Sequence, residues 1–273
     1  MRTVILVHGF WHGSWCWSPV TAQLAALGVP SVAVDLEGHG LRARSPHAAS
    51  RRPFDAAAFA TEPSPVAGIT ASSAGAALAE DIRLIGGGEP CVVVAHSMGG
   101  AVATAAAELV PELFAQLVYV TAFAPVRGPV TDYFASPENA GEMVNRLIGA
   151  DPAAVGALRV DPAQRAALRE TFYHDVDPAT ADAAIALLTP DGPAGIITES
   201  LSVTSSRYGA VPHSYVVCAK DNAIPAPLQR RFVRDIDEVS AAPTTVVELD
   251  SAHSPFLSHP AELSGAIAAA VSG

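Results

Sequence analysis

Six short apolar runs recur along the chain, each about the length of one buried strand. Their residues are mostly Val, and polar residues rarely interrupt them, which is typical of strands covered on both faces of a parallel sheet. The runs are Thr3–Val7, Ser31–Asp35, Cys91–Ala95, Leu117–Ala122, Tyr215–Ala219 and Thr244–Leu249. The pattern therefore predicts a mostly parallel central sheet.

Segments with helical periodicity lie between these runs. They are predicted at Pro19–Leu27, Ala74–Ile85, Gly99–Val110, Leu228–Ile236 and Pro260–Val271. Alternation of strand and helix is typical of a layered α/β fold, in which ligands bind at the carboxyl ends of the strands.

Two long stretches interrupt this alternation. Gly38–Ser73 is rich in Pro, Ser and Arg, and is predicted to be a long irregular loop. Pro125–Arg207 contains no convincing strand, and its helical patterns lie at Glu142–Ile148, Pro162–Phe172 and Pro178–Leu188. Long excursions from a compact domain are usually lids or flexible segments. We therefore predict one domain over residues 1–273, with a core of about 1–124 and 208–273 and a helical cap of about 125–207.

Composition narrows the class of protein. Half of the 273 residues are hydrophobic, so a large core is within reach, and the net charge of −11 argues against a nucleic-acid partner. The three cysteines (Cys16, Cys91 and Cys218) are odd in number and widely spaced, which indicates neither a disulfide framework nor a zinc site. The chain shows no bilayer-length apolar run and no signal peptide, so we expect a cytoplasmic protein without a membrane partner.

The segment Cys91–Ala101 carries the most informative pattern. A buried strand ends in Ser97, and a helix of small residues follows at once, which is the strand–turn–helix context of a nucleophile elbow. The strained turn requires small residues two positions on either side of the serine, and these are Ala95 and Gly99. A serine at this place can instead simply cap the helix. His96 is not expected to act as the base, because adjacent residues diverge at a tight turn.

The loop after the first predicted strand, His8–Trp17, is a candidate oxyanion hole. Acyl transfer needs two backbone N–H groups aimed at the tetrahedral oxygen, one after the nucleophile and one from such a loop. We assign these donors to Met98 and Phe10. His8 and His12 have a spacing that on a helix could bind zinc, but they flank glycines in a loop and lack the glutamate of a metalloprotease helix, so no metal is expected.

A serine nucleophile needs a histidine base and a carboxylate that orients it. Where the serine lies at a nucleophile elbow, the acid and the histidine follow it along the chain in that order, and each is expected just after a strand. Asp221 follows the run that ends at Ala219, and His253 follows the last run, so these two are the candidates. Asp250 is a rival acid, three residues before the histidine. His213 and His259 lie at less suitable places.

The chain resembles the α/β-hydrolase superfamily over essentially its whole length, and within it the plant methylesterase and hydroxynitrile lyase group with its bacterial esterase relatives. The matching motifs are Val7–Gly9 with His12–Trp17, Asp35–Gly40, His96–Gly100, Lys220–Pro225 and Ala252–Phe256. The resemblance implies an α/β-hydrolase fold with an inserted helical cap and the triad Ser97, His253 and Asp221, and it is compatible with a homodimer.

Three positions separate the esterases of this group from the lyases. The lyases carry a threonine in place of Gly9, a lysine in place of Ser254, and tend to carry an acid in place of His96. That lysine supplies the positive charge for a cyanide leaving group, and Lys220 does not match its position. The sequence is therefore expected to lie on the esterase side.

The expected activity is that of a cofactor-free serine esterase acting on a small-molecule ester or lactone with a hydrophobic moiety. Alternatives are a thioesterase, cyclase or carbon–carbon hydrolase with the same triad, and a ligand-binding receptor with little turnover. Candidate pocket residues are Trp11, Phe123, Tyr133, Phe134, Phe172 and Tyr173. Arg42, Arg44, Arg51 and Arg52 could attract an anionic tail, although a solvated loop explains them more simply.

Overall fold

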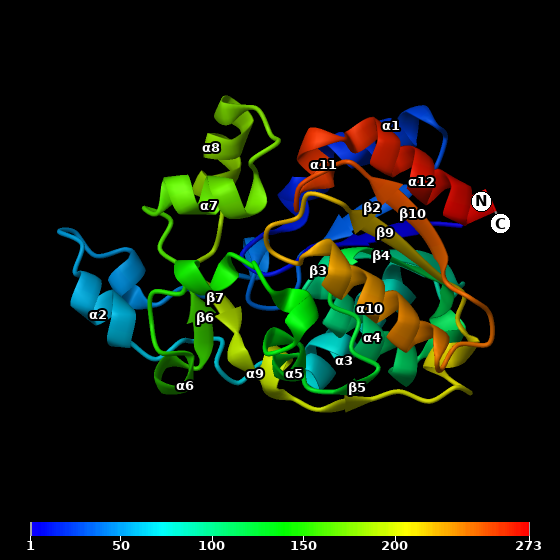
Figure 1. The fold of residues 1–273 in the computed structure, drawn as a ribbon, viewed down its shortest axis with the longest axis horizontal. Coiled ribbons are helices and arrows are strands. Elements are labelled where there is room, and N and C mark those ends of the chain that lie inside the picture. Colours follow the sequence, from blue (N-terminus) through cyan, green and yellow to red (C-terminus); the bar gives the residue numbers. More distant parts are fainter. Residues whose placement is uncertain (1, 273) are drawn as a thin grey trace.

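The computed structural model describes residues 2–272 and has a central sheet of six parallel strands (Figure 1). The strands are β1 (Val4–Val7), β2 (Ser31–Val34), β3 (Cys91–Ser97), β4 (Phe114–Ala122), β9 (His213–Cys218) and β10 (Thr245–Leu249). They lie in the order β10-β9-β4-β3-β1-β2, and every neighbouring pair is parallel. The predicted parallel sheet is confirmed.

The strands are continuously apolar because each face of the sheet supports its own core. In β1, Ile5 and Val7 belong to one hydrophobic cluster, whereas Val4 and Leu6 belong to the other. Side chains alternate between the two faces of a strand, so both alternating sets must be apolar when helices cover both faces.

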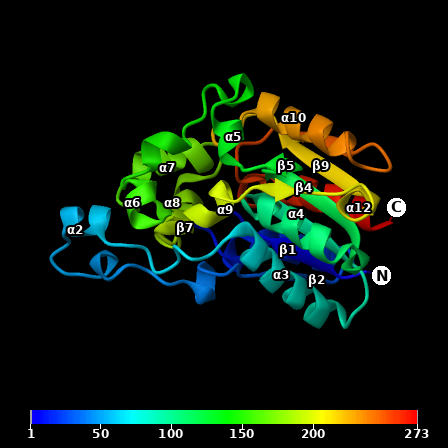
Figure 2. The same ribbon diagram turned by 90° about the horizontal axis from the view of Figure 1, so that it is seen from below.

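Helices cover the two faces in two groups, as Figures 1 and 2 show. On one face α1 packs against α12, and on the other α3 packs against α4, with α10 beside β9. These helices and the short α11 are α1 (Ser18–Ala26), α3 (Ala71–Gly86), α4 (Gly99–Leu109), α10 (Ala226–Asp237), α11 (Pro255–Ser258) and α12 (Pro260–Ser272). Among residues 2–272, none of the helices has the length and hydropathy needed to cross a bilayer.

The segment between β4 and β9 is only partly helical, and the prediction that it contains no strand is wrong. Its helices are α5 (Thr131–Phe134), α6 (Pro152–Val155), α7 (Arg165–Phe172), α8 (Pro178–Ala186) and α9 (Ala194–Thr198). Two antiparallel pairs accompany them, β5 (Arg127–Gly128) with β8 (Leu201–Ser202) and β6 (Ala157–Arg159) with β7 (Asp191–Pro193). Strands of two or three residues are too short to show an alternating pattern. The helix predicted over 142–148 is a 3-10 turn, Val144–Leu147.

The stretch Gly38–Ser73 is also more ordered than the predicted irregular loop. It contains 3-10 turns at Gly40–Arg42 and His47–Ala49, the helix α2 (Ala56–Thr61) and the first residues of α3. The side chain of Asp55 accepts a hydrogen bond from the Ala58 N–H at 3.0 Å and so caps α2. These short elements are hard to predict in a stretch rich in Pro, Ser and Arg, because none of the elements spans two full amphipathic turns.

A buried ion pair ties this stretch to the cap. Arg159 in β6 and Asp191 in β7 form two N–H to oxygen bonds of 2.7 Å, with 0% and 2% of their side chains exposed. The remaining guanidinium nitrogen donates to the Phe59 and Glu62 carbonyls at 2.5 and 2.8 Å. The charge of Arg159 is therefore fully partnered, and it joins α2 to the β6–β7 ribbon.

Removal of one partner should destabilise the protein strongly. In Asp191→Asn the Arg159 charge stays buried without its counter-charge, and such losses typically amount to about 3–5 kcal/mol of unfolding free energy. Urea denaturation would measure the change. The matched control is Glu80→Gln, which breaks the exposed Arg83–Glu80 pair and should change stability by less than about 1 kcal/mol. Equal effects of the two variants would contradict the structural role assigned to Arg159.

Candidate active site

Ser97 occupies the strained turn between β3 and α4. Its φ of +53° lies in the left-handed region, which is uncommon for a residue other than glycine. Its carbonyl accepts a hydrogen bond from the Phe123 N–H at 3.0 Å. A Cβ at Gly99 would collide with the His8 carbonyl, so the small residue predicted at this position is required by close packing against β1. Strain held in place by neighbouring packing is characteristic of functional sites.

The structure brings together the three predicted side chains from three strand ends. His253 Nε2 lies 3.1 Å from Ser97 Oγ, and His253 Nδ1 donates to Asp221 Oδ2 at 2.7 Å. The other oxygen of Asp221 accepts the N–H groups of Ala223 and Ile224 at 2.6 and 3.0 Å. These bonds hold the carboxylate in place and leave its other oxygen facing the imidazole. The arrangement holds the histidine tautomer whose Nε2 can accept a proton from the serine.

The other candidates for the acid and the base lie away from Ser97. Asp250 is on the surface and pairs with Lys220 at 2.7 Å, with 78% of its side chain exposed. His213 is at the start of β9, where its ring hydrogen bonds with Ser240 at 3.2 Å. His259 follows α11 and contacts the neighbouring Ser258 hydroxyl at 2.9 Å. None of these hydrogen bonds joins the chain of contacts that ends at Ser97.

The loop after β1 runs directly against Ser97. A Cβ at Gly9 would lie 2.5 Å from Ser97 Cβ, so any larger residue here must displace the loop or the serine. The N–H groups of Phe10 and Met98 belong to buried residues and have no hydrogen-bond partner in the described part of the chain. Two such donors beside a serine nucleophile are the elements of an oxyanion hole.

Two histidines hold the peptide units of this loop. His8 Nδ1 donates to the Gly9 carbonyl at 2.7 Å, and its Nε2 accepts the Leu36 N–H at 3.0 Å. Because a trans peptide points its carbonyl and its N–H in opposite directions, the bond to Gly9 fixes the direction of the Phe10 N–H. His12 Nδ1 donates to the Phe10 carbonyl at 2.8 Å and its Nε2 contacts the Tyr173 hydroxyl at 2.7 Å.

Both ring nitrogens of each histidine are therefore engaged within the protein. His8 and His12, whose spacing on a helix could bind zinc, instead hold the peptide units of this loop in place. Over residues 2–272, no group of three or more His, Cys, Asp or Glu side chains is placed to hold a metal ion.

The sequence did not predict the contacts that three supporting residues make. Thr121, at the end of β4 with a φ of +37°, donates its hydroxyl to Asp221 Oδ2. His96 Nε2 donates to the His253 carbonyl at 2.8 Å. Asp175, in the cap, accepts the Ala252 N–H at 2.8 Å. Each acts across a long sequence separation, and the only available signal was the place of Thr121 at a predicted strand end.

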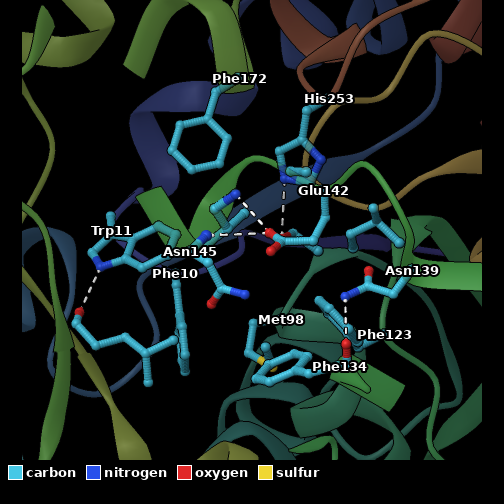
Figure 3. Close-up of a pocket in the computed structure, with 15 residues that line it drawn as sticks. Phe10, Trp11, Met98, Phe123, Phe134, Asn139, Glu142, Asn145, Phe172 and His253 are labelled. Atoms are coloured by element: carbon cyan, nitrogen blue, oxygen red, sulfur yellow. Dashed lines mark hydrogen bonds between the residues drawn. The ribbon is translucent and has the colours of Figure 1, made fainter. Parts of the chain in front are cut away.

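A cavity opens at Ser97 and His253 beneath the cap (Figure 3). Four of the six predicted aromatic residues line it: Trp11, Phe123, Phe134 and Phe172. The other two predictions are wrong. Tyr133 packs on Phe232 with ring centroids 4.7 Å apart, and Tyr173 reaches His12 instead. The cap and the oxyanion loop are joined at Trp11, whose indole N–H donates to the Leu158 carbonyl at 3.0 Å.

Burial of these histidines predicts loss of stability in mild acid. Burial lowers the pKa of His8 and His12 to about 3 and that of His39 to about 4, because the charged ring loses its hydration. In the unfolded chain these pKa values return to about 6.5, so the unfolded state binds more protons as the pH falls below that value. Stability is therefore full above about pH 6.5 and decreases as the pH falls toward the folded-state values.

Each of these histidines should lower the unfolding free energy by roughly 1.4 kcal/mol between about pH 7.5 and 5.5. Denaturation in urea at a series of pH values would measure the slope. The His39→Gln protein should take up about one proton fewer on unfolding, so its slope should be shallower. A stability that stays constant over this range would contradict the buried, neutral state of these rings.

Comparison with known proteins places this site in a family. The model of the alpha/beta hydrolase family matches residues 4–266, and the chain belongs to this family. Methylesterase 7 of Arabidopsis thaliana is 29% identical over 282 residues, which cover 96% of this chain and 93% of that protein. Methyl jasmonate esterase 1 of Vitis vinifera is 27% identical over 280 residues, covering 96% and 94%. The resemblance to the methylesterase group is confirmed, and these relatives support an ester hydrolase.

Solved structures agree with this fold. A pyrethroid hydrolase superposes with a TM-score of 0.79 at 21% identity, covering 100% of this chain and 98% of that chain. A variant of polyneuridine aldehyde esterase superposes with a TM-score of 0.74 at 22% identity, covering 98% of each chain. At these identities the likeness concerns the fold.

Proposed function

We propose that the protein is a serine esterase that cleaves a small-molecule carboxylic ester or lactone through an acyl-enzyme on Ser97. The observation that supports this most strongly is the continuous hydrogen-bonded chain from Asp221 through His253 to Ser97, which ends in a mostly apolar cavity. An Asp–His–Ser chain makes a neutral hydroxyl nucleophilic at neutral pH.

In the first half of the reaction His253 Nε2 takes the Ser97 proton while Oγ attacks the ester carbonyl carbon. The carbonyl oxygen becomes an oxyanion and receives the N–H groups of Phe10 and Met98. When the tetrahedral intermediate collapses, the carbon–oxygen bond to the alcohol breaks and His253 passes its proton to the leaving alkoxide. In the second half His253 takes a proton from water, whose oxygen attacks the acyl carbon. When this second tetrahedral intermediate collapses, the carbon–oxygen bond to Ser97 breaks and His253 returns the proton to Oγ, which releases the acid and restores the free serine.

The surroundings of the base support hydrolysis over cyanide release. Ser254 follows the histidine, and Lys220 is engaged with Asp250 at the surface. None of the residues that line the cavity is a lysine. A leaving cyanide would therefore meet no lysine ammonium group in this cavity.

A panel of p-nitrophenyl esters of increasing acyl length, together with lactones, tests the proposal. We expect turnover of a neutral ester, and stoichiometric covalent labelling by a fluorophosphonate that mass spectrometry locates on Ser97. Turnover confined to thioesters or to carbon–carbon bonds would overturn the ester assignment in favour of a specialised enzyme. Absence of labelling in the folded protein would overturn the nucleophile assignment and favour a receptor.

A further inference from the structure

The cavity wall carries one carboxylate that the proposed reaction does not use. Glu142, from the cap, lines the same cavity as Ser97 and His253. In Figure 3 its side chain extends beneath the His253 ring toward the middle of the pocket. Its Oε2 accepts the N–H groups of Val144 and Asn145 at 2.7 and 3.2 Å. Its Oε1 has no hydrogen-bond partner among residues 2–272, so the carboxylate is held in place with one oxygen free.

The rest of the wall suits a positively charged group of moderate size. Aromatic rings dominate it, contributed by Phe10, Trp11, Phe123, Phe134 and Phe172. None of the 15 lining residues is Lys or Arg. The faces of aromatic rings attract cations, and aromatic cages are a common way to bind alkylammonium groups. The net charge of −11 adds a long-range attraction for cations.

An anionic substrate finds no comparable partner. Arg42 pairs with Asp81 at 2.8 Å, and Arg52 lies beside a separate groove with Phe54 and Phe59. Arg44 and Arg51 do not line the cavity either. A carboxylate or phosphate in the pocket would face Glu142 without a compensating side chain, which is unfavourable in a partly desolvated site.

We propose that the substrate is an ester whose acyl or alcohol part carries an alkylammonium group, which binds between the Glu142 carboxylate and the aromatic wall. This inference rests on the proposed esterase function and specifies its substrate class. Glu142 selects the substrate by charge and takes no part in bond cleavage.

Binding to the Ser97→Ala protein tests the proposal without turnover. Calorimetry would compare acetylcholine with its neutral isostere, 3,3-dimethylbutyl acetate, and the second pair would be methyl 4-(trimethylammonio)butanoate and methyl 5,5-dimethylhexanoate. The first pair places the charge on the alcohol side and the second on the acyl side. In at least one pair the cation should bind about tenfold more tightly. Adding Glu142→Gln should remove most of that preference, because only the aromatic wall then still favours the cation.

Glu138→Gln is the matched control. Glu138 lies in the same part of the cap, but it faces Arg231 at 3.5 Å and does not line the cavity. The Glu138→Gln substitution removes the same formal charge as Glu142→Gln. An equal effect of both variants would therefore show only the long-range electrostatic field of the protein and would overturn the proposal. Equal binding of cationic and neutral esters would also overturn it. If cationic and neutral esters bind equally but neutral esters are still hydrolysed in a Ser97-dependent way, the esterase function is retained. If no ester is hydrolysed but the preference for the ammonium group is intact, the esterase function is disproved and the ammonium site is retained.

Discussion

The Ser97→Ala protein is expected to hydrolyse a neutral ester about 10⁴ to 10⁶ times more slowly than the native protein, with the reduction mainly in kcat. Removal of a serine nucleophile leaves only the catalysis that comes from substrate binding and the oxyanion donors. Steady-state kinetics with a p-nitrophenyl ester, after treatment of the preparation with a fluorophosphonate to silence contaminating hydrolases, would measure the residual rate.

The fold should survive this substitution. Ser97 has a φ of +53°, a conformation strained for serine and alanine alike, so the change removes the hydroxyl without adding a new steric demand. Thermal denaturation would check this point. Ser18→Ala serves as the control, because Ser18 is an exposed residue at the start of α1 whose hydroxyl bonds to the Trp15 carbonyl. Retention of more than about a tenth of the native kcat by Ser97→Ala would disprove the nucleophile assignment.

The Asp221→Asn protein should lose about 10⁴-fold in kcat while remaining folded. Because one oxygen of Asp221 accepts the Ala223 and Ile224 N–H groups, an asparagine would keep its carbonyl oxygen there. Its NH₂ group would then face His253 Nδ1 and make that nitrogen an acceptor. The proton would move to Nε2, where it prevents the histidine from accepting the proton of Ser97.

Asp250→Asn separates this effect from a general loss of charge near the base. Asp250 was the rival acid in the sequence, but it lies at the surface with Lys220 as its partner. Its substitution should leave kcat within about twofold of the native value, since exposed ion pairs contribute little. If Asp250→Asn inactivated the protein and Asp221→Asn did not, the assignment of the acid would be reversed.

The sequence by itself determined the features whose signals are local. The six apolar runs predicted the sheet because both faces of each strand are buried, which requires continuous apolar character. The serine elbow could be found in the sequence because strand, turn and small-residue helix follow each other within eleven residues. The positions of Asp221 and His253 just after strands were enough to propose them, because the carboxyl ends of parallel strands meet at one edge of the sheet.

Only the tertiary structure decided which groups support these residues. Thr121 reaches Asp221 across 100 residues of sequence, and Asp175 reaches the loop of the base across 77. The short cap strands and the 3-10 turn that places Glu142 in the cavity are too brief to show a periodic pattern. Hydrogen bonds and packing between segments far apart in the sequence depend on chain folding as a whole. For that reason the place of Glu142 in the pocket wall, and with it the proposed preference for a cationic ester, follows from the three-dimensional arrangement and not from any local motif.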